Sequence, residues 1–181
     1  MIEIEVKAKL KEPDKILHKL ENMGCIFSEK ITQEDYIFLS QGMRFADITA
    51  GVNILRLRKE NDTVRFTIKQ HRHNELDCIE NEVIVSDFEK TGAMLAMMGY
   101  YEVVRYRKQR MTGKYADYTI CIDKVDKLGD FIEVECMSSE KIDGAQVQQE
   151  LFAFLSELGI QAQDRVLHGY DTMIVNLEQG A

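Results

Sequence analysis

The sequence predicts an α+β fold built on a mostly antiparallel sheet, open or closed on itself, with a few helices. Two observations carry this prediction. About eight segments have strand-like composition, and most are joined by connections too short for a parallel crossover. Three longer segments instead repeat apolar residues at helical spacing and end at a glycine.

The strands are expected where apolar and polar residues alternate. In residues 2–10 this alternation is strict, which assigns the charged side chains to one face and the apolar ones to the other. Tight turns are expected at Asn61-Asp62 and at Gly113, and Leu128-Gly129-Asp130 separates the last two strands. The predicted strands cover residues 2–10, 33–39, 52–59, 63–71, 78–86, 101–111, 114–123 and 130–137.

Three helices are expected between these strands. Pro13 opens the first, which runs to Met23. The second spans residues 87–98 and the third residues 143–158, and each is followed by a glycine. Because each helix leads toward an apolar or aromatic segment, we expect all three to lie against the outside of the sheet.

The composition is typical of a globular protein with a sizeable core. Of the 181 residues, 45% are hydrophobic and 30% are charged. We expect a single domain over residues 1–177 and a short tail over residues 178–181. The formal net charge of -8 would repel nucleic acid and anionic membranes, so any anion must bind at a local cluster of bases.

The cysteines indicate neither a disulfide framework nor a zinc site, because they form no C-x-x-C pair and no histidine lies at zinc-finger spacing. They are Cys25, Cys78, Cys121 and Cys136, and we expect them to be buried, reduced thiols. The N-terminus lacks an apolar targeting segment, and no run approaches the roughly 20 apolar residues of a membrane span. The expected location is therefore the cytoplasm.

Charged side chains recur two residues apart on several predicted strands. Arg56 and Arg58 would lie about 7 Å apart on one face and repel each other unless an anion lies between them. Paired carboxylates such as Glu3 and Glu5 suit a hard cation, and Mg²⁺ prefers one or two carboxylates together with phosphate oxygens. Acids for a cation beside bases for a polyphosphate are what metal-assisted phosphoryl transfer requires. The alternative is a solvated sheet face without a ligand.

Six charged motifs follow one another in order along almost the whole chain. They are E-x-E-x-K at Glu3, Glu5 and Lys7; L-R-x-R at Arg56 and Arg58; T-x-K ending at Lys69; E-x-E at Glu80 and Glu82; K-x-R at Lys108 and Arg110; and D-x-V-x-x-L-G-x-F-x-E-x-E from Asp123 to Glu135. This set resembles the CYTH family, which joins class IV adenylyl cyclases with thiamine triphosphatases and other triphosphate tunnel metalloenzymes.

The resemblance implies a closed eight-stranded antiparallel barrel that forms a tunnel, with the charged faces inward and the helices packed outside. It implies that Mg²⁺ or Mn²⁺ is held by the carboxylates of Glu3, Glu5, Asp123, Glu133 and Glu135. It also implies that the triphosphate is held, and its charge neutralised during catalysis, by Lys7, Arg56, Arg58, Lys69, Lys108 and Arg110. Glu80 and Glu82 are expected to complete the substrate-binding lining.

The same resemblance implies a metal-dependent enzyme whose substrate is ATP, thiamine triphosphate or inorganic triphosphate. The last motif looks most like the class IV adenylyl cyclases, which convert ATP to cyclic AMP and pyrophosphate. A triphosphatase that releases phosphate is the alternative, and a non-catalytic polyphosphate- or nucleotide-binding module is a second. No nucleic-acid or membrane partner is expected, while apolar sheet surfaces are compatible with a homodimer.

A few residues leave their roles open. Where class IV cyclases tend to carry a Ser-Tyr pair near the C-terminus, this chain has a glycine before Tyr170. His71 and His73 could form a metal or base-recognition site, but a solvated loop is favoured because no third ligand lies at a suitable spacing. Further bases that could contribute, although strand phase would as readily place them outside, are Arg65, Arg105 and Arg107.

Overall fold

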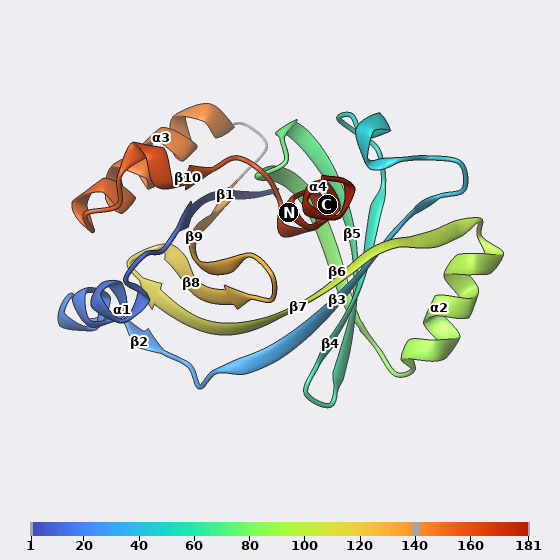
Figure 1. Cartoon of the computed structure of the whole chain (residues 1–181), viewed down its shortest axis with the longest axis horizontal. Helices are drawn as coiled ribbons and strands as arrows, with labels where there is room; N and C mark the ends of the chain where they lie inside the picture. Colours follow the sequence, from blue (N-terminus) through green and yellow to red (C-terminus); the bar gives the residue numbers. More distant parts are fainter. Residues whose placement is uncertain (1, 139–141, 181) are drawn as a thin grey trace.

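Eight strands close into an antiparallel barrel, which confirms the predicted fold class (Figure 1). The computed structural model describes residues 2–138 and 142–180. Neighbours around the barrel follow the order β1-β6-β5-β4-β3-β7-β8-β9, and β9 pairs back to β1. The strands are β1 (Ile2–Lys9), β3 (Ile31–Ser40), β4 (Ile54–Glu60), β5 (Thr63–Asn74), β6 (Asp77–Val85), β7 (Tyr100–Tyr115), β8 (Tyr118–Val125) and β9 (Gly129–Ser138).

Two short strands and four α-helices complete the described part of the chain. Strand β2 (Ile26–Phe27) pairs with β7, and β10 (Arg165–Val166) pairs with the second half of β1. The helices are α1 (Pro13–Asn22), α2 (Phe88–Met97), α3 (Gly144–Glu157) and α4 (Tyr170–Gln179), with short 3-10 turns η1 (Phe45–Asp47) and η2 (Ala162–Asp164). Within the described ranges, no helix is long and apolar enough to cross a membrane.

The apolar faces of the strands point outward, and the three predicted helices cover those of β1, β3, β4, β8 and β9, whereas Ile68 of β5 and Val83 of β6 remain exposed. Ile4 and Val6 of β1 are fully buried in a cluster that includes Leu20 of α1 and Leu151 of α3. On the other side of the barrel, Leu95 of α2 packs in a second cluster over β3 and β4. These helices bury much of the outer surface, so the larger part of the hydrophobic core lies around the barrel rather than inside it.

One end of the barrel interior is apolar and is closed by α4, a helix that the sequence pattern did not predict. Ile37 and Ile54 line the interior, and they form a buried cluster with Leu39, Val104 and Ile174 of α4. The helix therefore lies across the barrel opening, as Figure 1 shows near its centre. Burial of this apolar ring explains why the charged cavity occupies only part of the lumen.

Two local predictions were wrong. Gly113 is not a turn residue but lies inside β7, opposite Ile120 of β8, and the hairpin turns at Ala116-Asp117 instead. A Cβ atom at position 113 would lie 2.6 Å from the Sγ atom of Cys25, so a close approach of the chain requires this glycine. His71 and His73 belong to β5, which continues to Asn74, rather than to a loop.

Candidate active site

A charged cavity of about 420 Å³ occupies the barrel interior. Twelve of the thirteen residues that the sequence predicts for the site line it. The exception is Asp123, which is fully buried and contacts two of the lining bases, Lys108 and Arg110. The closure of the barrel thus gathers groups from seven strands around one space.

The register of the strands decides which charges meet. Glu5 of β1 lies directly opposite Glu135 of β9, and Lys7 lies opposite Glu133. Directly opposed carboxylates destabilise a sheet unless a cation lies between them. Glu5 and Glu135 therefore form a local excess of negative charge. In the neighbouring pair, the positive charge of Lys7 compensates the negative charge of Glu133.

One side of the cavity is built around the buried carboxylates of Glu133 and Asp123. The Nζ atom of Lys7 lies 3.1 Å from Glu133 and 3.5 Å from Glu5. Arg110 donates to both oxygens of Asp123 at 2.7 and 2.5 Å, and it also donates to Glu133. Lys108 donates to Asp123 at 3.3 Å. These contacts hold the bases in fixed positions at the surface of the cavity.

The opposite side carries the two arginines of β4. Arg58 makes a two-point contact with the fully buried Asp35 at 2.6 and 2.8 Å. Arg56 lies 3.7 Å from Glu80 and 3.6 Å from Glu82, and its buried Nε atom has no hydrogen-bond partner within the described structure. A buried donor without a partner is costly, so this group is suited to an incoming anion.

The carboxyl groups of the site divide into two electrostatic classes. Burial opposes ionisation of Glu80, but Lys69 and Arg56 outweigh it and lower the pKa of Glu80 to about 2. Lys7 and Arg110 likewise hold the pKa of the buried Glu133 well below its usual range. In contrast, burial and repulsion from neighbouring carboxylates raise the pKa of Glu3 to about 8 and that of Glu5 to about 7. The second class lacks enough positive charge around it.

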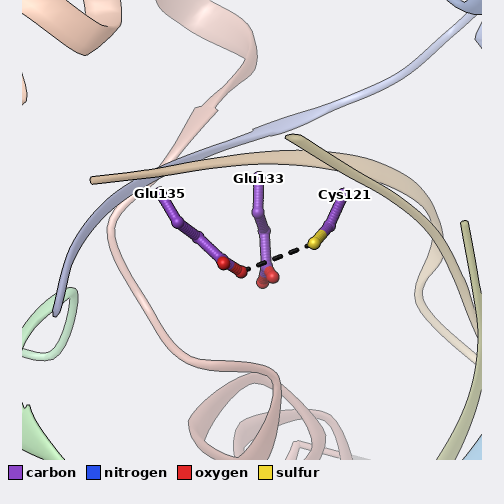
Figure 2. A group of neighbouring side chains, drawn as sticks. All are labelled: Cys121, Glu133 and Glu135. Atoms are coloured by element: carbon purple, nitrogen blue, oxygen red, sulfur yellow. Dashed lines mark hydrogen bonds between the residues drawn. The ribbon is translucent and has the colours of Figure 1, made fainter. Parts of the chain in front are cut away.

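The under-compensated carboxylates lie together. One ligand oxygen from each of Glu3, Glu5 and Glu135 can be chosen so that all lie within 4.8 Å of one another. A second group shares Glu135 and joins it to Glu133 and Cys121, whose thiol donates to Glu135 at 3.5 Å (Figure 2). Carboxylate oxygens at this spacing fit Mg²⁺ or Mn²⁺, and the thiol adds a softer donor at the edge of the site.

Tyr170, at the start of α4, connects this helix to the charged cavity. Its hydroxyl donates to Asp123 at 3.1 Å, and its ring lies 4.1 Å from the Nζ atom of Lys7. The ring also lies 5.0 Å from Lys108. Tyr170 therefore packs against the bases that face the cavity, which a local sequence pattern could not show.

Sequence reasoning missed several groups around the cavity. Asp35 lies on the inward face of β3 opposite Arg58 of β4, but in the sequence it follows two other polar residues, Gln33 and Glu34, so no local signal distinguishes it. Cys121 was expected to be buried, and it is, but its contact with Glu135 depends on strand register. Of the additional arginines, Arg65 binds Glu82 at 2.9 Å beside the cavity, whereas Arg105 has a side chain 70% exposed.

The fold and the charged lumen together define a tunnel-barrel protein. The CYTH domain matches residues 1–170, so the chain belongs to the CYTH domain family. It is also 30% identical over 172 residues to a protein of Methanocaldococcus jannaschii called "Putative adenylate cyclase MJ0240", and the match covers 94% of this chain and 97% of that protein.

Solved structures bear out the fold. A protein from Vibrio parahaemolyticus, called a "putative adenylate cyclase", superposes with a TM-score of 0.82 at 18% identity over 97% of this chain and 98% of that chain. HpAC1 from Hippeastrum, described as having a dominant triphosphatase activity, superposes with a TM-score of 0.60 at 15% identity over 93% of this chain and 90% of that chain.

Proposed function

We propose that the protein is a metal-dependent enzyme that acts on triphosphates in its tunnel and, like the class IV adenylyl cyclases, converts ATP to cyclic AMP and pyrophosphate. The observation that carries the proposal is the presence, in one cavity, of six bases beside the under-compensated carboxylates of Glu3, Glu5 and Glu135. A site for an anion alone would gain nothing from these carboxylates, because they would repel it.

Glu3, Glu5 and Glu135 would hold the cation, with Glu133 as a further ligand beside them. A bound Mg²⁺ or Mn²⁺ would supply charge neutralisation at the phosphate oxygens. Asp123 was also expected to be a ligand, but Lys108, Arg110 and Tyr170 already surround it. Its proposed part is therefore to hold those bases, since direct ligation would require Arg110 to move.

The six bases would bind the phosphates and stabilise the charge that develops on the leaving group. In the cyclase reaction, the ribose 3′-oxygen bonds to the α-phosphorus, loses its proton, and displaces pyrophosphate. In the alternative triphosphatase reaction, water bonds to the γ-phosphorus and the bond to the β-bridging oxygen breaks, which gives phosphate and a diphosphate. The final D-x-V-x-x-L-G-x-F-x-E-x-E motif and the archaeal relative's name favour the first reaction.

Product analysis with and without metal tests the proposal. The purified protein is treated with EDTA and incubated with ATP, thiamine triphosphate or tripolyphosphate, before and after addition of Mg²⁺ or Mn²⁺. Cyclic AMP and pyrophosphate from ATP would support the cyclase, whereas phosphate release would identify a triphosphatase. If no triphosphate is consumed with either metal, the enzyme proposal fails and a binding module remains.

A further inference from the structure

A second hollow, of about 590 Å³, lies beside the charged cavity at the end of the barrel that α4 closes. Its walls are residues 44–46 and 48–50 around the turn η1, the end of β5 from His71 to Asn74 with Glu75 after it, and one side of α4. Its volume is within the range of small-molecule binding sites. None of the predicted triphosphate-binding residues lines it.

The hollow and the charged cavity adjoin through two pairs of residues. His71 lines the hollow and lies two positions beyond Lys69 on the same face of β5, a spacing of about 7 Å. On α4, Asp171 lines the charged cavity and the next residue, Thr172, lines the hollow. A molecule whose phosphates contact Lys69 is therefore within reach of the hollow.

The charged groups of the hollow already have partners. Arg44 forms a two-point contact with Asp47 at 3.1 and 3.0 Å. Glu75 accepts hydrogen bonds from Gly169 at 2.8 Å, and the imidazole of His168 lies 3.0 Å away. Arg72 lies 3.3 Å from Asp77, which compensates its charge, although its buried Nη1 atom makes no hydrogen bond within the described residues. Because these charges are compensated locally, the hollow suits an uncharged group.

The remaining polar groups of the hollow can recognise such a group. Neither the half-buried imidazole of His71 nor the side-chain amides of Asn176 and Gln179 have a hydrogen-bond partner within the described residues. Burial and the nearby Lys69 lower the pKa of His71, which keeps the ring neutral with one donor and one acceptor nitrogen. Phe45 adds an aromatic surface. Amide and imidazole groups beside an aromatic ring match the edge and face of a nucleobase.

We propose that this hollow binds the heterocyclic base of a nucleoside triphosphate whose phosphates lie in the tunnel. The inference rests on the proposed function, because it needs the triphosphate to be anchored by the tunnel bases. It gives the tunnel a preference for nucleotides over inorganic triphosphate, which would leave the hollow empty.

The test is a comparison of ATP and tripolyphosphate binding in the presence of Mg²⁺ or Mn²⁺, measured by calorimetry. Ala46 lines the hollow and is exposed, so Ala46→Trp narrows it without disturbing the core. We expect this variant to bind ATP about tenfold or more weakly, or about 1.4 kcal/mol, and tripolyphosphate unchanged. The matched control, Ala96→Trp on the exposed side of α2, should affect neither ligand.

A second variant gives a readout that does not depend on loss of affinity. The chain contains no tryptophan, so Phe45→Trp places a single indole at the hollow. Its fluorescence should change with saturating ATP and not with saturating tripolyphosphate. The inference is overturned if Ala46→Trp weakens both ligands equally or neither, or if the indole responds alike to both. If the wild type binds neither triphosphate, the proposed function itself fails.

Discussion

Replacing Glu3 with glutamine is predicted to stabilise the metal-free protein, and to do so far more at pH 8 than at pH 5. Glu3 is held close to Glu5 and Glu135 without a sufficient counter-charge. If those carboxylates exist to bind a cation, then in the absence of that cation they must oppose folding. The neutral amide has nearly the same shape and removes one of the repelling charges.

The magnitude follows from the pKa of the buried group. Burial, with added repulsion from Glu135 and Glu80, raises the pKa of Glu3 from 4.5 to about 8. When the pKa of a carboxyl group is higher in the folded than in the unfolded protein, the group costs no stability below its unfolded-state pKa. Stability is then lost as the pH rises from the unfolded-state pKa through the folded-state pKa. At about 1.4 kcal/mol per pKa unit, ionisation of Glu3 opposes folding by about 4 kcal/mol at pH 8 and by about 1 kcal/mol at pH 5. The variant should gain stability by up to these amounts.

Urea denaturation in EDTA, followed by far-ultraviolet circular dichroism at both pH values, measures the effect. Glu29→Gln is the matched control, because Glu29 is exposed and does not line the cavity. Saturating Mn²⁺ should then stabilise the wild type at pH 8 more than it stabilises Glu3→Gln. A variant that is less stable than the wild type at pH 8, or a gain that is equal at the two pH values, would refute the reasoning.

Three further substitutions probe the other parts of the site. Glu135→Gln should reduce metal-dependent turnover by about 100-fold or more, while the circular dichroism spectrum stays unchanged. If the variant is as active as the wild type at saturating metal, the proposed role of Glu135 is contradicted. Lys69→Ala should weaken tripolyphosphate binding by about tenfold, measured by calorimetry, because it removes one charge-assisted contact. Asp35→Ala should lower the free energy of unfolding by about 3–5 kcal/mol in urea denaturation, because it leaves the Arg58 guanidinium buried and unpaired. A loss below about 1 kcal/mol would show that water or another group replaces the carboxylate.

Much of the fold could be predicted because the strands carry a strict period of two. The alternation in residues 2–10 separates the charged side chains from the apolar ones in the same way that β1 does. The three predicted helices also occur, since their apolar spacing and final glycines are local signals. The turn predicted at Gly113 does not occur. This glycine is required instead because the side chain of Cys25, which is remote in sequence, leaves no room for a Cβ atom at position 113.

The candidate site was predictable in membership but not in geometry. The motifs selected the residues that line the cavity, yet alternation alone is symmetrical and does not say which face lies inside a closed sheet. The partnership of Arg58 with Asp35 depends on the pairing of β3 with β4. The insertion of Tyr170 depends on where α4 docks, and no local pattern encodes that position.

The amino-acid sequence by itself determined the two-faced strands, the three outer helices and the set of charged residues available for chemistry, because these follow from spacing and side-chain type. Only the tertiary structure decided that β9 closes onto β1, that Glu5 meets Glu135, and that α4 fills one end of the lumen. The reason is physical. Burial of the apolar faces under helices turns the charged faces inward, and strand register then sets which charges are compensated and which require a ligand.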